Sequence, residues 1–238
     1  MLLLDAMCGR FTLTRTERAE LAYELGVPVE SLPESAYKPR YNIAPTDPHW
    51  IVRVRYEERE LLPAKWGLVN SWAKDAKRAA LQINARCETL AKLPPFRDAF
   101  RRRRCIVPAD GFFEWTGTKD ARQPLWFHRS DGQLLLFAGL YESWESSPGE
   151  RQRTFTIVTT GANLLMAPVH DRMPVILAED GVEEWLNPRR EDVHELSKLL
   201  VPAPEGLLVA TPVSQRLNSV KNDDPGCLEP APVAARLL

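Results

Sequence analysis

Four side chains in this sequence could together carry out covalent and proton-transfer chemistry: Cys8, Asn84, Glu114 and His170. A cysteine thiolate is a nucleophile, a carboxyl group and an imidazole can transfer protons, and an amide can both donate and accept hydrogen bonds. Thiol, imidazole and an orienting polar group are also the inventory of a cysteine peptidase. The residue types alone therefore leave at least two reaction classes open.

Each of these residues has a structural explanation when it is taken singly. Free cysteines such as Cys8 are usually small buried hydrophobes. Glu114 stands between Phe113 and Trp115, and in a strand it could face water while its neighbours face inward. A lone histidine such as His170 is more often structural than catalytic. The combination of segments along the chain, rather than any one residue, favours a function.

Three arginines lie in the same short segments as the candidate catalytic residues: Arg10, Arg86 and Arg172. Guanidinium groups bind phosphates with two parallel hydrogen bonds, so these arginines are candidate phosphate ligands. Trp66 and Trp72 could stack on bases, as aromatic side chains do in single-strand binding. Core packing is the alternative for both tryptophans.

Composition and charge exclude several classes of protein. The chain has 238 residues, 44% of them hydrophobic, with a formal net charge of −1, which argues against a general polyanion binder. The four cysteines and four histidines lack zinc-like spacing, so we expect no metal and no cofactor. No apolar run approaches the ~18 residues of a membrane helix and no secretory signal is evident, which favours a cytoplasmic protein without a membrane partner. No coiled-coil or repeat pattern appears, so we expect a monomer.

The pattern of apolar residues predicts more strands than helices. Strands are predicted at 50–56, 61–69, 124–129, 133–141, 154–159, 174–178 and 207–211, and helices at 16–26, 95–103, 162–167, 181–186 and 191–200. Asp131-Gly132 predicts a hairpin between two of the strands, and residues 27–48, with five prolines, predict an extended loop. Strands that follow one another without regular crossover helices favour an antiparallel α+β fold in one domain, residues 7–222, preceded by an extension of residues 1–6 and followed by a loose tail, 223–238.

Seven motifs in a fixed order then resemble one protein family. They are M-C-G-R-F, Y-N-I-A-P-T, W-G-L, N-A-R-x-E-T, G-F-F-E-W, H-D-R-M-P and V-K-N-D-D-P, running from residue 7 to about residue 230. In this order they resemble the SOS-response-associated peptidase (SRAP) family, which shields abasic sites in single-stranded DNA by crosslinking to them. The resemblance implies a single compact domain with a β-barrel-like core flanked by helices. It also implies that Cys8, Asn84, Glu114 and His170 are the catalytic residues and that abasic single-stranded DNA is the partner.

The chemistry that the resemblance implies suits an N-terminal cysteine. The terminal amine of Cys8 can condense with the sugar aldehyde of an abasic site, and its thiolate can then close a five-membered thiazolidine ring. Glu114 is expected to donate the proton that releases water, because an aromatic pocket of Phe113 and Trp115 would raise its pKa. His170 is expected to protonate the sugar ring oxygen, and Asn84 to hold the amine.

One departure concerns the start of the chain, because six residues precede Met7. Translation could begin at Met7 with removal of that methionine, the protein could cleave itself before Cys8, or the extension could persist and leave a noncovalent DNA binder. We expect the mature protein to begin at Cys8. The alternatives are a cysteine peptidase built on the same residues and a noncatalytic single-strand binder.

Overall fold

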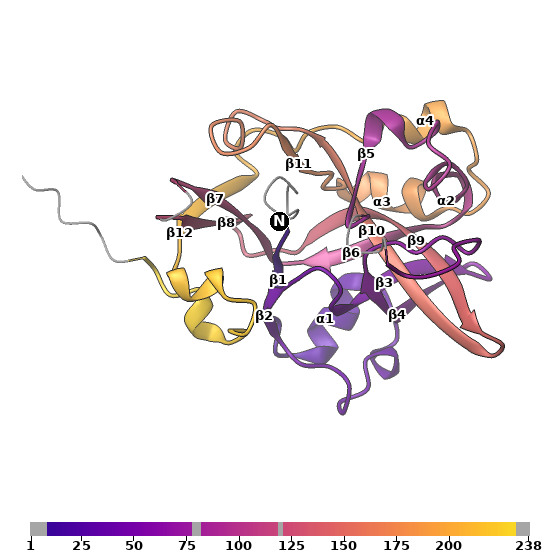
Figure 1. Cartoon of the computed structure of the whole chain (residues 1–238), viewed down its shortest axis with the longest axis horizontal. Helices are drawn as coiled ribbons and strands as arrows, with labels where there is room; N and C mark the ends of the chain where they lie inside the picture. The colour runs from indigo at the N-terminus through magenta and orange to yellow at the C-terminus, as the bar shows by residue number, and fades with distance from the viewer. Residues whose placement is uncertain (1–8, 78–81, 119–120, 232–238) are drawn as a thin grey trace, which may run out of the picture.

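The computed structural model describes residues 9–77, 82–118 and 121–231, so Cys8 and the predicted extension of residues 1–6 lie outside the described residues. Within these ranges, no helix is long and apolar enough to cross a bilayer. The described chain forms two sheets that share one core, with helices on the outside (Figure 1).

The larger sheet closes into a barrel of five strands. These are β3 (Pro48–Arg55), β4 (Glu58–Trp66), β10 (Glu150–Gly161), β9 (Leu135–Ser147) and β6 (Arg104–Ala109). The ring closes because β10 pairs with β9 on one edge and with β4 on the other. All pairs in the ring are antiparallel except β10 with β4, which is parallel. The predicted α+β class with a β-barrel-like core is therefore confirmed, with one parallel pair added.

The second sheet has five antiparallel strands in the order β12-β8-β7-β1-β2. Their bounds are β12 (Leu208–Pro212), β8 (Gln123–Arg129), β7 (Gly111–Thr116), β1 (Phe11–Leu13) and β2 (Arg40–Ile43). One face packs on the barrel: the Phe11 ring meets Trp66 edge-on at a centroid distance of 5.0 Å, and Phe112 meets Phe137 at 6.0 Å. Aromatic contacts thus fix the second sheet, and the segments that precede and follow its strands, against the barrel.

Strands β8 and β9 do not form the predicted hairpin. The chain turns at Asp131-Gly132, where Gly132 has a φ of 71° and its N–H donates to the Arg129 carbonyl over 3.2 Å. However, β8 belongs to the second sheet and β9 to the barrel. The predicted turn is present, but it transfers the chain from one sheet to the other, because β8 pairs with β7 and β12 while β9 pairs with β6 and β10.

Short helices cover the outside of the barrel, with α2, α3 and α4 gathered at one side in Figure 1. They are α1 (Arg18–Leu25), α2 (Arg97–Arg102), α3 (Glu179–Leu186) and α4 (Val193–Ser197), with 3-10 turns η1 (Val29–Ser31), η3 (Cys87–Thr89), η4 (Gln215–Asn218) and η5 (Pro225–Cys227). Helix α1 ends where predicted, at Gly26, whose φ of 63° is the left-handed conformation that glycine favours.

The helix predicted at 162–167 is wrong, because this segment is a series of turns. The Asn163 side chain accepts the Met166 N–H over 3.1 Å and donates to the Ala203 carbonyl over 3.2 Å, so it competes with helical hydrogen bonds. Pro168 then lacks the N–H that a continuing helix would need. The predicted loop at 27–48 is also partly wrong, since it contains β2.

Residues 223–231, placed by the sequence in a loose tail, instead pack on the second sheet. Cys227 is buried in a cluster with Phe113, Val213 and Leu217, and Val213 forms a β-bridge with Pro230. Apolar side chains at these few positions find a second small core on the face of β7 that points away from the barrel. The described fold therefore extends beyond residue 222.

Candidate active site

Strand β10 extends beyond the closed part of the barrel. Two short strands that contain predicted site residues pair with its opposite edges there. Strand β4 pairs with it up to Phe155, after which β5 (Asn84–Arg86) takes over, with Asn84 opposite Ile157. On the other edge β11 (Arg172–Pro174) pairs with β10, with Arg172 opposite Gly161. The pairing therefore brings two separate segments of the sequence, N-A-R and H-D-R, to one end of the barrel.

An ion pair ties these two edges together. The Arg172 guanidinium donates to both carboxylate oxygens of Glu88, over 2.5 and 2.9 Å, and to the Thr159 carbonyl over 2.8 Å. The hydrogen bonds from Arg172 hold the pKa of Glu88 low, at about 2. The sequence assigned no role to Glu88, although an acidic residue inside an arginine-bearing segment was a signal for such a pair. The predicted phosphate contact of Arg172 stays a prediction.

His170 lies just before β11, with its side chain one quarter exposed. Its Nδ1 lies 3.0 Å from the Arg172 backbone N–H and 2.9 Å from a carboxylate oxygen of Asp171. In the neutral ring Nδ1 can accept from the backbone, which leaves the proton on Nε2; in the charged ring Nδ1–H can donate to Asp171. Both protonation states of the imidazole therefore have a partner for Nδ1, as a proton carrier requires.

Glu114 lies in β7 and is only 7% exposed. It shares its side of the strand with Phe112, which belongs to the main core, whereas Phe113 belongs to the smaller cluster on the opposite side and Trp115 packs against that cluster. The predicted pocket of Phe113 and Trp115 around Glu114 is therefore wrong, because successive side chains of a strand point to opposite faces. Burial of the carboxyl group, which the proposed acid role needs, is what the structure shows.

Arg10 lies opposite Phe113, the residue before Glu114, because the Arg10 carbonyl accepts the Phe113 N–H over 3.0 Å, and its side chain lies on the Trp115 side of β7. Its guanidinium Nη1 donates to Asn42 Oδ1 over 2.8 Å, and the guanidinium carbon lies 5.7 Å from the centroid of the Trp115 ring. Burial lowers the pKa of Arg10. The described chain begins one residue before Arg10, so the strand that pairs with β7 leads directly back to Cys8.

The two tryptophans differ sharply in exposure. Trp66 is 0% exposed and its ring stacks on Phe155, so the predicted base-stacking role of Trp66 is wrong and the alternative, core packing, holds. Trp72 is 66% exposed in a loop that follows β4, where a base could reach it. Arg86 is exposed at the end of β5. Base stacking by Trp72 and phosphate binding by Arg86 stay predictions.

Trp66 has a different role, because it spans the two groups of site residues. Its indole N–H donates to the carbonyl of Ile83, the residue before Asn84, over 2.9 Å. Its ring packs against Phe11, the residue after Arg10. The spacing between the N-terminal strand and β5 is thus set by one buried tryptophan.

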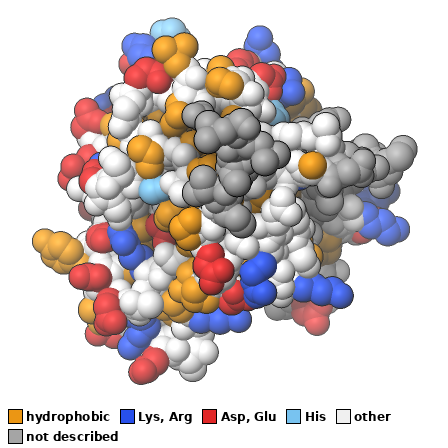
Figure 2. Space-filling view, turned by 90° about the vertical axis from the view of Figure 1, so that its left-hand side faces the viewer, with side chains coloured by type: hydrophobic (Ala, Val, Ile, Leu, Met, Phe, Trp, Pro, Cys, Tyr) orange, Lys and Arg blue, Asp and Glu red, His pale blue; other side chains and the backbone are white. Residues whose placement is uncertain are grey.

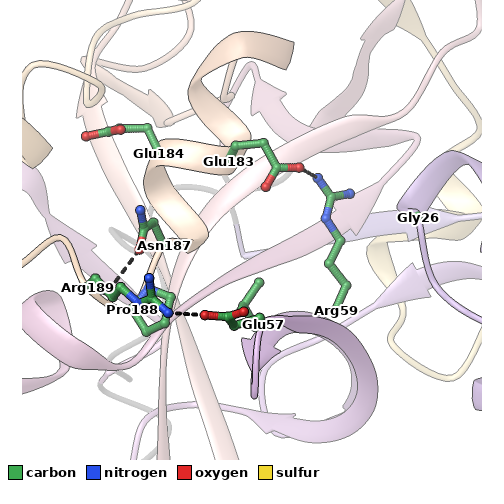
Figure 3. A pocket seen from close by; sticks show the side chains of 9 residues that line it. Gly26, Glu57, Arg59, Glu183, Glu184, Asn187, Pro188 and Arg189 are labelled. Carbon is green, nitrogen blue, oxygen red and sulfur yellow. Dashed lines mark hydrogen bonds and ion pairs between the residues drawn. The ribbon is translucent and has the colours of Figure 1, made fainter.

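The surface gives further limits on ligand binding. A hollow of about 770 Å³ lies between the β3–β4 hairpin and α3, away from every predicted site residue (Figure 3). The residues that line this hollow include two ion pairs, Arg59 with Glu183 and Arg189 with Glu57. On the face drawn in Figure 2, acidic and basic side chains are interspersed. Within the described ranges, no cluster of three or more potential metal ligands is found.

Comparison with known proteins identifies close relatives. Residues 7–220 match the model of a family described as "SOS response associated peptidase (SRAP)". Abasic site processing protein YoqW of Bacillus subtilis (strain 168) is 40% identical over 224 residues, which cover 94% of this chain and 99% of that protein. Abasic site processing protein HMCES of Gallus gallus is 33% identical over 233 residues, covering 84% of this chain and 69% of that protein. A crystal structure of a Bacteroides thetaiotaomicron protein superposes with a TM-score of 0.83 at 27% identity, covering 94% of this chain and 100% of that chain.

Proposed function

Since this chain belongs to the SOS response associated peptidase family, we propose that it processes abasic sites in DNA by forming a covalent adduct through Cys8. One observation carries the proposal beyond the family: the buried carboxyl group of Glu114 lies on the strand that pairs with β1, and β1 leads directly back to Cys8. The described residue next to Cys8 in the sequence, Gly9, is therefore joined to a strand that pairs with the one carrying a buried acid.

The bonds formed and broken define the reaction. The terminal amine of Cys8 adds to the aldehyde carbon of the opened sugar, and the carbinolamine loses its oxygen as water to give an imine. The Cys8 thiolate then adds to the imine carbon, and the nitrogen takes up a proton. The product is a thiazolidine ring, formed with the net loss of one water molecule. An internal cysteine cannot close this ring, because its nitrogen is acylated.

The proton transfers are assigned to the buried and half-buried groups of the site. Glu114 protonates the departing oxygen of the carbinolamine, since burial favours the neutral, proton-bearing form of a carboxyl group. His170 protonates the sugar ring oxygen and so opens the sugar to its aldehyde form. Asn84, on β5, orients the amine of Cys8.

Contacts to DNA are assigned to exposed and half-buried groups around these residues. Arg10, Arg86 and Arg172 bind phosphates beside the lesion, and Trp72 stacks on a neighbouring base. Single-stranded DNA is the proposed form, because a stacked base is more accessible there. We further propose a monomer that works in the cytoplasm, where a free Cys8 thiol persists.

A cysteine peptidase is the second candidate, and the names of the relatives, abasic site processing proteins, give it no support. Incubation with an oligonucleotide that carries one abasic site, beside a peptidase assay, distinguishes the crosslinking function from the peptidase function. A heat-stable band of protein plus DNA on a denaturing gel is expected, together with no cleavage of a fluorogenic peptide. Peptide cleavage without an adduct would reverse the assignment, and salt-reversible binding alone would leave a noncovalent binder.

A further inference from the structure

The side chain of Asn42 joins Arg10 to the C-terminal end of the described chain. Asn42 lies in β2 and is 1% exposed. Its Oδ1 accepts from Arg10 Nη1 over 2.8 Å, while its Nδ2 lies 2.7 Å from the Asn222 carbonyl and 3.0 Å from the Ser219 carbonyl. Arg10 Nη1 also donates to the Leu217 carbonyl over 3.0 Å. One buried amide therefore fixes both a guanidinium and a loop.

The loop in question is the C-terminal segment, residues 214–228. A second anchor holds it on β2, because Asp223 accepts the backbone N–H of Tyr41 over 2.6 Å and that of Asn42 over 3.0 Å. Arg40 forms an ion pair with the same carboxylate. The C-terminal segment is thus attached to β2 at several points, and it lies beside that strand in Figure 1 (yellow).

The C-terminal segment also contacts Trp115, which follows Glu114 in β7 and lies on the opposite face of that strand. Trp115 donates its indole N–H to Asn218 Oδ1 over 2.8 Å, and the same ring faces the Arg10 guanidinium. Beyond this contact the segment exposes Ser219, Val220 and Lys221 to solvent. It therefore forms a wall along the side of Arg10, with exposed residues at its rim.

The hydrogen bonds of Arg10 leave part of its guanidinium for a ligand. Its hydrogen bonds to Asn42 and Leu217 both use Nη1, and within the described ranges nothing accepts from Nη2. A guanidinium held at one nitrogen by fixed acceptors presents its remaining N–H groups in a fixed direction. Without Asn42, Arg10 Nη1 would keep only the Leu217 carbonyl as an acceptor, and the Ser219 and Asn222 carbonyls would lose the hydrogen bonds from Asn42 Nδ2.

We propose that Asn42 is a positioning residue that aims the Arg10 guanidinium at a DNA phosphate, and that the C-terminal segment forms one wall of the DNA site. The inference rests on the proposed function, since it needs DNA as the ligand. Asn42 does not touch the DNA. It acts through Arg10, and its effect on DNA binding must therefore disappear when Arg10 is absent.

The salt dependence of DNA binding separates this role from a merely structural one. Each phosphate contact in single-stranded DNA contributes about 0.7 to the slope of log affinity against log salt concentration. Asn42→Ala removes no charge, yet it is expected to lower the slope by about 0.7, as Arg10→Gln does. The double variant is expected to show the slope of Arg10→Gln alone. Binding is measured on a single-stranded oligonucleotide with a reduced abasic site, which cannot crosslink.

Gln123→Ala is the matched control. Gln123 donates from its side-chain amide to the Val213 carbonyl over 2.8 Å, just before the same segment, but it does not contact Arg10. The slope of log affinity against log salt concentration for Gln123→Ala is expected to equal that of the wild type. If Asn42→Ala does not fold, Asn42→Ser, which also lacks the Nδ2 donors, is measured in its place.

An unchanged slope in the Asn42 variants, or a loss that adds to that of Arg10→Gln, overturns the inference. These outcomes are distinguishable from failure of the proposed function, because the wild type is tested first for its adduct with an unreduced abasic site. A wild type that forms no adduct contradicts the function. A wild type that forms one, with Asn42 variants of wild-type slope, contradicts only the role of Asn42.

Discussion

The indole N–H of Trp66 donates to the carbonyl of Ile83 over 2.9 Å, at the point where β5 begins. Trp66 ends β4, and its ring meets Phe11 of β1. Both partners are the immediate neighbours of proposed site residues, Asn84 and Arg10. The tryptophan that the sequence placed against DNA bases is therefore a core residue that sets the distance between two parts of the site.

Substitution Trp66→Phe is expected to destabilise the protein and to slow crosslinking. Loss of the indole N–H removes one of two donors to the buried Ile83 carbonyl, which keeps the Ile157 N–H, so the lost hydrogen bond costs about 0.5–1.5 kcal/mol. Trp185→Phe is the matched control, because Trp185 is equally buried and donates to the Cys105 carbonyl over 2.9 Å, away from the site. Urea unfolding should show similar losses in both, and adduct formation should slow only in Trp66→Phe. Equal rates in the two variants would contradict a spacing role.

The ion pair of Glu88 with Arg172 is expected to make stability depend on pH. The pKa of Glu88 is lowered to about 2 in the folded protein, against an ordinary value of about 4.3. A depressed carboxyl pKa stabilises the fold above the ordinary value, and this contribution is lost as the pH falls towards 2. The free energy of unfolding of the wild type should exceed that of Glu88→Gln at pH 6, and the difference should shrink towards pH 2. A difference that does not change with pH would show that the ion pair does not stabilise the fold.

Trp72→Ala is expected to weaken DNA binding without changing stability. Base–aromatic stacking contributes about 1–3 kcal/mol per base, so the dissociation constant should rise roughly 5- to 150-fold. Tyr23, an exposed aromatic side chain on α1 with 88% exposure, provides the control variant Tyr23→Ala. Fluorescence anisotropy with a labelled single-stranded oligonucleotide measures both. An affinity equal to that of Tyr23→Ala would leave Trp72 as an incidental surface residue.

Cys8→Ala is expected to abolish the covalent adduct and to leave noncovalent DNA binding mostly intact. The amine and thiol of one cysteine supply both ring-closing bonds, so alanine can at most form a reversible imine. Cys87→Ala should crosslink normally, because burial raises the pKa of the Cys87 thiol and disfavours its nucleophilic thiolate form. A heat-stable adduct of the Cys8→Ala protein would identify a different nucleophile.

Long strands were predictable from the sequence, and short ones were not. The predicted strands at 50–56 and 154–159 correspond to β3 and β10, whose apolar and β-branched residues repeat clearly. Strands β1 and β5 have three residues each, too few for a period to appear. They exist because longer strands, β7 and β10, offer them hydrogen-bonding edges, which local sequence does not report.

Site residues were located by motif, but their surroundings depend on tertiary packing. The sequence could not separate Trp66 from Trp72, because only the packing of distant Phe11 and Phe155 buries the former. The motif Y-N-I-A-P-T supported the family resemblance, but the sequence predicted no role for its individual residues. In the structure Asn42 donates a hydrogen bond to the C-terminal segment. Thr46 adopts a φ of 73°, which is unusual for a β-branched residue, and its N–H donates to the Trp66 carbonyl. Both roles depend on partners far away in the sequence.

Intact mass of the protein from its native host tests the central claim most directly, before and after incubation with an abasic single-stranded oligonucleotide. Cys8 must carry a free amine for the thiazolidine ring to close. The mass before incubation should therefore be that of a chain starting at Cys8, and the mass afterwards should equal protein plus oligonucleotide minus one water molecule. A chain that retains Met1 and gains no mass would contradict the account.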